Sequence, residues 1–254
     1  MYDNVIQSVH RATKILGLFS FREPRLGITE ISRALNLHKG TVQGLVRTLM
    51  QEGFLRQDEG TRKYGLGLKI YELGVTLGGS LEINQRASGP AHQLAKRTQN
   101  LVRVAIPDKD SVLVTLDAYP KSQPFYSPQF GPRAPLYCTA LGKALFAFWE
   151  KQEIDAYLEK VQLVPYTLNT ITRKNKLIKD LKDTRKRGYS INQEEHVLGR
   201  AAIGAPIFGR KGYPVASIVI VIGPSQLDGE INKFAQEVKK TALEISQSMG
   251  FSYL

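Results

Sequence analysis

Residues 39–51, KGTVQGLVRTLMQ, combine side chains that recognise DNA with apolar residues at helical spacing. Gln43 and Arg47 can each make two hydrogen bonds to a base edge, to adenine and guanine respectively, and Lys39 can neutralise a phosphate. A cation at a helix start opposes the helix dipole by roughly 0.3–1 kcal/mol, and Gly44 costs the helix about 1 kcal/mol relative to Ala. Both costs are explained if the exposed face meets DNA, because glycine lets the backbone approach the groove closely.

Two further helices are predicted ahead of this segment. Residues 8–21 carry apolar side chains at steps of three and four, which is typical of one helical face. Thr29 is a suitable N-cap for a short second helix, Asn36 tolerates the tight turn that follows, and Gly53 closes the third helix. The positions expected to face the core are Val9, Ala12, Leu16, Phe19, Ile31, Ala34, Leu35, Val42, Leu45, Val46, Leu49 and Met50. This order of elements predicts a helix-turn-helix.

Two short strand-like runs follow the third helix and flank the turn DEGT at residues 58–61, which predicts a β-hairpin. Three helices and a hairpin make a winged helix-turn-helix, and Arg62 and Lys63 near the hairpin tip could reach backbone phosphates. Two alternatives fit the same periodicity: a solvated helix face with incidental glycines, and a winged domain that binds protein. The residues expected to contact double-stranded operator DNA are Arg11, His38, Lys39, Gly40, Thr41, Gln43, Gly44, Arg47, Arg62 and Lys63.

The charge balance favours a polyanionic partner without locating its binding surface. The chain has 254 residues, enough for two domains, and its 35 Lys and Arg against 23 Asp and Glu give a net charge of +12. A basic protein whose excess charge is simply solvated is the alternative. Residues 1–79 carry 11 basic and 7 acidic residues, so only +4 of the excess lies in the predicted DNA-binding part.

The remaining composition argues against several other classes of protein. Cys138 is the one cysteine, which excludes a disulfide within the chain and a cysteine zinc site, and the four histidines lack ligand spacing. The N-terminus lacks a signal-peptide pattern, and the longest apolar run, residues 215–222, is far shorter than the roughly 20 residues of a membrane helix. We expect a reduced, cytoplasmic protein without cofactor, metal or membrane partner.

The rest of the chain predicts a linker helix and a second domain. Breaks in the helical pattern are expected at Gly78–Gly79 and Gly89–Pro90. Strands are expected at residues 101–107, 111–119, 189–192, 201–208 and 215–222, and helices at 139–149, 152–160, 174–187 and 228–249. The pattern indicates an α+β domain with helices around a largely antiparallel sheet, and the basic helix at 174–187 is interpreted as solvated. The expected divisions are 1–67 for the DNA-binding domain, 68–80 for the linker helix and 81–254 for the second domain.

Four segments, in order and at shared spacing, resemble the isocitrate lyase regulator (IclR) family of bacterial transcription regulators. They are SVHRATKIL at 8–16, KGTVQGLVRTLMQEGFL at 39–55, GPRAPLYCTALGKALFAF at 131–148, and RGYSINQEEHVLG at 187–199, which continues into the strand AAIGAPI. The resemblance implies a winged helix-turn-helix, a linker helix and a C-terminal GAF-like α/β effector-binding domain. It also implies a homodimer or a dimer of dimers in which a small organic molecule, often from a catabolic pathway, changes operator binding.

The effector site is expected from the same resemblance. In family members that bind small oxoacids, an acid, a cysteine and two serines line the pocket. The matching positions here carry the less polar residues Asn192, Ala202, Ile220 and Ile222, the last two found by counting back from Gly223-Pro224. Such a lining favours a more apolar, for example aromatic, effector, and the start of the 139–149 helix could bind a carboxylate. The alternative is that the isoleucines are sheet core and the site lies elsewhere. The residues expected to contact the effector are Gln123, Tyr126, Ala140, Leu141, Asn192, Ala202, Ile220 and Ile222.

Two other functions stay open from the residues alone. An enzyme with Cys138 as nucleophile would need a histidine nearby, whereas its apolar neighbours favour a small buried side chain. An architectural DNA-binding protein without a ligand would bind DNA independently of sequence. We predict a ligand-responsive transcription regulator that is not an enzyme. The sequence does not separate repressor from activator, because promoter geometry decides between them.

Overall fold

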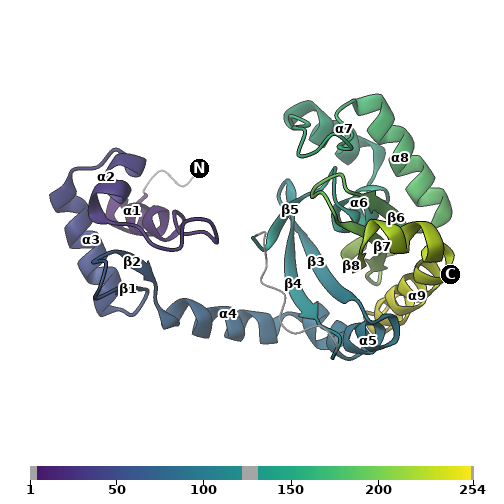
Figure 1. Cartoon of the computed structure of the whole chain (residues 1–254), viewed down its shortest axis with the longest axis horizontal. Coiled ribbons are helices and arrows are strands. Elements are labelled where there is room, and N and C mark those ends of the chain that lie inside the picture. The colour runs from purple at the N-terminus through teal and green to yellow at the C-terminus, as the bar shows by residue number, and fades with distance from the viewer. Residues whose placement is uncertain (1–4, 122–130, 253–254) are drawn as a thin grey trace. The chain divides into compact units, whose positions relative to one another are not determined.

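The structure is a computed structural model that describes residues 5–121 and 131–252. The chain forms two compact units that divide between Gly79 and Ser80, where helix α4 (Leu68–Ser80) ends (Figure 1). Among the described residues, no helix is both long and apolar enough to cross a membrane. Within the same residues, no group of three His, Cys, Asp or Glu side chains is placed to hold a metal ion.

The first unit is a winged helix-turn-helix, which confirms the sequence prediction. It consists of α1 (Gln7–Leu16), α2 (Ile28–Leu35), α3 (Lys39–Gln51) and the antiparallel hairpin of β1 (Leu55–Gln57) and β2 (Tyr64–Leu66), followed by α4. The apolar sides of these elements enclose one core, whose buried members are Ile15, Leu26, Ile31, Val42, Val46, Leu49 and Leu55. Asn36 and Gly53 are left-handed after α2 and α3, with φ of 51° and 74°, as predicted.

Two details of the first unit differ from the prediction. Val9 and Ala34 were expected in the core but lie exposed, and the buried residue of α1 is Ile15. The helical spacing of α1 fits more than one face, and packing against α3 selects the face that contains Ile15. The N-cap residue of α2 is Gly27 and not Thr29.

The linker helix α4 has an unusual surface. Every residue of α4, all within the described part of the chain, is at least partly exposed. Large apolar side chains account for much of this surface, because Leu68 and Tyr71 are 75% and 73% exposed and Leu73, Val75 and Leu77 are about half exposed or more. Patches of this kind mark interaction sites in soluble proteins.

The second unit is built on one six-stranded antiparallel sheet. Its strands are β3 (Leu101–Asp108), β4 (Ser111–Ala118), β5 (Arg133–Pro135), β6 (Ser190–Gln193), β7 (Ala201–Phe208) and β8 (Pro214–Ile222), in the order β5-β4-β3-β8-β7-β6. Helices α5 (Glu82–Thr98) and α9 (Pro224–Ser248) cover one face, and α6 (Ala140–Phe146), α7 (Lys151–Lys160) and α8 (Lys174–Arg187) cover the other (Figure 1). Each face has its own apolar core. Because successive side chains of a strand point to opposite faces of the sheet, neighbouring residues join different cores.

Helix boundaries in the second unit account for most differences from the prediction. The chain breaks at Leu81, and Pro90 lies inside the continuous helix α5. Its buried side, from Ile83 to Thr98, packs against α9 and the sheet, which offsets the roughly 3 kcal/mol that an interior proline costs. Helix α6 ends at Phe146, earlier than predicted, and strand β5 was not predicted at all.

Candidate nucleic-acid interface and ligand site

Helix α3 turns one face to the core and the opposite face to solvent. The buried residues are Val42, Val46 and Leu49, and the exposed ones include Lys39, Gly40, Thr41, Gln43, Gly44 and Arg47. His38 caps the helix start, because its Nδ1 accepts a hydrogen bond from the Gly40 N–H at 3.2 Å. The structure therefore gathers the predicted DNA-contacting residues of α3 on one open surface, with His38 holding its first turn.

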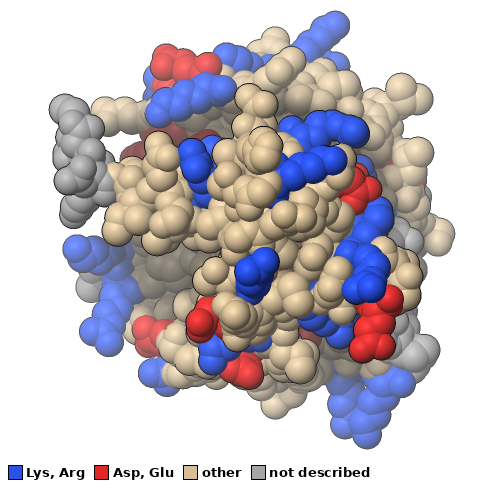
Figure 2. All heavy atoms as spheres, turned by 90° about the vertical axis from the view of Figure 1, so that its left-hand side faces the viewer, with Lys and Arg blue, Asp and Glu red and all other residues tan. Residues whose placement is uncertain are grey.

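This open face of α3 is not used by the fold itself. A Cβ built at Gly44 meets no described atom within 4 Å, so internal packing does not require glycine there. The ion pairs in the described part of the first unit leave out Lys39 and Arg47. Figure 2 looks onto the molecule from the side of α2 and α3, where Lys and Arg side chains are more frequent than Asp and Glu. The surface suits a polyanion.

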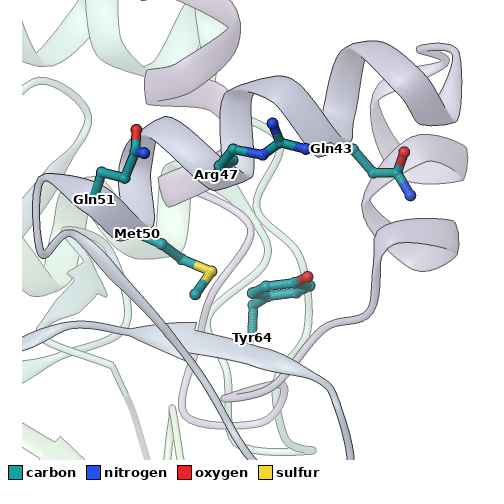
Figure 3. Close-up of a pocket in the computed structure, with 5 residues that line it drawn as sticks. All are labelled: Gln43, Arg47, Met50, Gln51 and Tyr64. Carbon is teal, nitrogen blue, oxygen red and sulfur yellow. The ribbon is translucent and has the colours of Figure 1, made fainter.

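A groove runs along α3 beside strand β2 (Figure 3). It has a volume of about 530 Å³ and is lined by Gln43, Arg47, Met50, Gln51 and Tyr64. In Figure 3, Met50 projects from α3 toward the Tyr64 ring, while Arg47 extends along the helix toward Gln43. The groove thus has polar side chains along the helix and two apolar groups between the helix and the strand. Met50 was predicted only as a core residue, and Tyr64 was not predicted to have a role.

Of the two wing cations that were predicted to contact DNA, Arg62 is exposed and Lys63 forms an ion pair. Arg62 is exposed at the hairpin tip with φ of 57°. The turn before it is held by Asp58, whose carboxylate accepts hydrogen bonds from the Thr61 N–H and hydroxyl, and these bonds lower the pKa of Asp58. Lys63 Nζ lies 2.8 Å from Glu30 Oε1 on α2, so it braces the wing as well as facing solvent. Arg11 is half-buried and lies on α1, so it belongs neither to α3 nor to the wing.

The candidate ligand site of the second unit lies on the α6 side of the sheet. Ala140 and Leu141, in the first turn of α6, are buried, and Asn192 pairs with Ala202 across β6 and β7. The Asn192 side-chain amide donates to the Cys138 carbonyl, so this amide group is already used by the fold. The first turn of α6 is also partly satisfied, because the Gly142 N–H donates to Thr139 Oγ1 at 3.0 Å. Gln123 and Tyr126 lie outside the described residues.

The placement of Ile220 and Ile222 in this site is wrong. Both belong to the core beneath α5 and α9, on the opposite face of the sheet from Ala140 and Leu141. The pairing of β7 with β8 places Ala202 opposite Val221 and Gly204 opposite Val219, so these two valines face α6. In a strand a shift of one residue exchanges the two faces, so the neighbours Val219 and Val221 are the residues of β8 that share a face with Ala140 and Leu141. Both valines are apolar, whereas Arg103, which pairs with Val219 across β3 and β8, brings a charged side chain to the same face.

Two charged groups on this side of the second unit were missed by the sequence analysis. On the sheet, Arg103 and Asp117 form a two-bond ion pair across β3 and β4, with Nε–Oδ1 and Nη2–Oδ2 distances of 2.8 and 2.9 Å. In α6, Lys143 is 1% exposed and places Nζ 2.5 Å from Glu195 Oε1 and 3.0 Å from Asp180 Oδ2. Each of these ion-pair clusters joins residues that are distant in sequence, so no pattern of neighbouring residues indicated it.

Cys138 has the surroundings of a structural residue. It is fully buried in the core between the sheet and α6. Burial, assisted by the nearby Glu195 carboxylate, raises the pKa of its thiol to about 12. A thiol with so little thiolate at neutral pH is a poor nucleophile.

Comparison with known proteins agrees with both units. Residues 8–59 match the IclR helix-turn-helix domain, and residues 76–247 match the bacterial transcriptional regulator IclR C-terminal domain. The chain is 31% identical to the HTH-type transcriptional regulator XynR of Escherichia coli over 97% of this chain and 98% of that one. It is 32% identical to the glycerol operon regulatory protein of Streptomyces coelicolor, over 96% and 97% of the two chains. The crystal structure of an IclR transcriptional regulator from Alicyclobacillus acidocaldarius superposes with a TM-score of 0.86 at 25% identity, covering 97% of this chain and 100% of that one.

Proposed function

Because the chain belongs to the IclR family of bacterial transcriptional regulators, whose members bind DNA and respond to ligands, we propose that it binds operator DNA sequence-specifically through α3 and the wing. Its matched relatives are named as regulators, not as enzymes. The observation that supports the proposal most strongly is the open face of α3. On this face, Lys39 and Arg47 take part in none of the ion pairs of the described first unit. The same face carries Gly44, a glycine that internal packing does not require.

Binding of the full-length chain to a duplex selected from a random-sequence pool tests this proposal. Arg47→Ala should weaken binding to the selected duplex about tenfold or more, since a two-bond contact to guanine contributes roughly 1–3 kcal/mol of discrimination. Arg173→Ala is the matched control, because it removes the same charge from an exposed position in the second unit. Equal loss in both variants would show that Arg47 acts only through net charge.

A homodimer is part of the proposal, and α4 supplies its support. Two copies of α3 are needed to occupy half-sites one or more helical turns apart, about 34–36 Å for one turn. The exposed apolar residues of α4, with Leu68 and Tyr71 foremost, form a surface that a second copy of this chain could cover. Because such a regulator acts where operator DNA is, we propose a cytoplasmic location.

The effector is proposed to be a small, fairly apolar organic molecule bound on the α6 side of the sheet, of the kind that controls a catabolic operon. Support comes from Ala202, Val219 and Val221, which are apolar and face α6, and from the Asn192 side-chain amide, which already donates to the Cys138 carbonyl. Binding would shift the population toward dimers whose α3 helices fit, or do not fit, the half-site spacing. A thermal-shift screen should find stabilisation by aromatic or branched acids, and stabilisation only by small oxoacids would contradict the apolar site.

A further inference from the structure

We propose that the groove beside α3 reads the C5-methyl group of a thymine in each half-site through Met50 and Tyr64, next to the base contacted by Arg47. This inference rests on the proposed DNA-binding function and deepens it, because it assigns specificity to two residues that otherwise count as core. The groove is lined by Gln43, Arg47, Met50, Gln51 and Tyr64 and has a volume of about 530 Å³ (Figure 3).

The chemistry of the groove matches the edge of a base pair. Gln43, Arg47 and Gln51 follow one another at steps of four along α3, so they form a polar rim on one side of the groove. Eight residues of helix rise about 12 Å, which spans roughly three to four stacked base pairs at about 3.4 Å each. In the major groove only thymine presents a methyl group, and apolar side chains are its usual contacts. The Arg47 cation and the two amides on the rim favour DNA over an apolar protein segment.

The apolar part of the groove is fixed in place before any ligand binds. Tyr64 pairs with Gln57 on β1 and, on its other edge, exchanges backbone hydrogen bonds with Leu26 at 2.8 and 2.9 Å. Its hydroxyl accepts a hydrogen bond from Gln57 Nε2 at 3.3 Å. Met50 lies next to the buried Leu49, which anchors this turn of α3. Both side chains are partly buried against the core and also line the groove, so their apolar groups are held at its floor.

The position of the methyl-bearing base follows from the helix. Met50 is three residues beyond Arg47, one turn along α3 and about 4.5 Å further along its axis. The thymine should therefore lie within about two base pairs of the base at which Arg47→Ala relaxes sequence preference.

Replacement of thymine by deoxyuridine, one position at a time in the selected operator, removes single methyl groups without changing the protein. For the full-length chain we expect one thymine in each half-site, beside the Arg47-dependent base, whose replacement weakens binding about fourfold, the value of one buried methyl group. Met50→Gln, which keeps a long unbranched side chain, should discriminate less between the thymine and deoxyuridine operators, because only the Tyr64 ring still contacts the methyl group. Tyr64→Phe keeps the ring and should retain the discrimination.

The possible outcomes separate this inference from the proposed function. Specific binding with no deoxyuridine-sensitive thymine beside the Arg47-dependent base, or with undiminished sensitivity in Met50→Gln, would overturn methyl recognition and leave sequence-specific DNA binding intact. Failure of the full-length chain to prefer any duplex would instead overturn the proposed function. Sensitive thymines elsewhere in the operator would locate methyl recognition outside this groove and also contradict the inference.

Discussion

Replacement of Gly44 by alanine should make the protein more stable and its operator complex weaker. Glycine within a helix costs about 0.8–1.0 kcal/mol relative to alanine. At Gly44 this cost is recovered in full, because the new Cβ meets no described atom within 4 Å. The gain of about 1 kcal/mol should raise the melting temperature of the first unit by roughly 4–8 °C. The same Cβ projects from the face that we assign to DNA, so it should hinder close approach of the helix backbone.

Two assays on one variant test both halves of this prediction. Differential scanning calorimetry measures the stability gain, and fluorescence anisotropy with the selected operator measures the affinity. Gly142→Ala is the structural contrast, because a Cβ there would lie 2.3 Å from the Leu136 carbonyl oxygen and should destabilise the second unit. If Gly44→Ala raises stability without lowering affinity, the glycine is incidental and the reasoning about backbone approach is refuted. A loss of stability would show instead that the site is not open.

Three further predictions concern the buried ion pairs, the cysteine and the linker helix. Lys143→Met should destabilise the second unit by about 3–5 kcal/mol, since it leaves the buried Glu195 carboxylate without its cation. The decrease in the free energy of unfolding, measured with urea, should be smaller at pH 5 than at pH 8. Burial raises the pKa of Glu195, so low pH favours the neutral acid, which needs no cation. Equal decreases at the two pH values would contradict an ionised Glu195 as the partner of Lys143. Cys138, with its thiol pKa of about 12, should resist a thiol reagent at pH 8 until urea unfolds the chain, and rapid reaction in the native state would revive a reactive role. Val75→Glu on α4 should shift the chain from dimer to monomer in analytical ultracentrifugation, and an unchanged mass would exclude α4 from the dimer interface.

Helix α3 was predictable because its signals are local. Helical spacing in residues 39–51 placed Val42, Val46 and Leu49 on one side, and the glycine and polar residues on the other, as the structure has them. The wing followed from a turn of four residues between two short strands. The groove was not predictable in the same way, because the position of Tyr64 depends on its pairing with Leu26, 38 positions earlier in the chain, as well as on the hairpin.

The sheet of the second unit shows where sequence reasoning loses information. Strand β8 is apolar on both faces, so its sequence did not reveal that Val219 and Val221 face α6 while Ile220 and Ile222 face the opposite core. Pairing with β7 supplies the missing register. Pro90 illustrates the opposite case, in which a strong local signal for a break is overridden by the packing of α5.

Other long-range pairs were invisible for the same reason. No role was predicted for Lys143 from the sequence, because its partners Asp180 and Glu195 come from α8 and from the connection between β6 and β7. Arg103 and Asp117 lie 14 residues apart on neighbouring strands. Without the register of the hairpin, neither spacing indicates an ion pair.

The affinity of the full-length chain for its selected operator, compared with a shuffled duplex of the same composition at physiological salt, tests the central claim most directly. A sequence-specific regulator should prefer the operator by about 10³-fold or more. Equal affinity for the two duplexes, with a steep dependence on salt, would mean that the basic surface binds DNA through its charge alone and would contradict the assignment of α3 as a recognition helix.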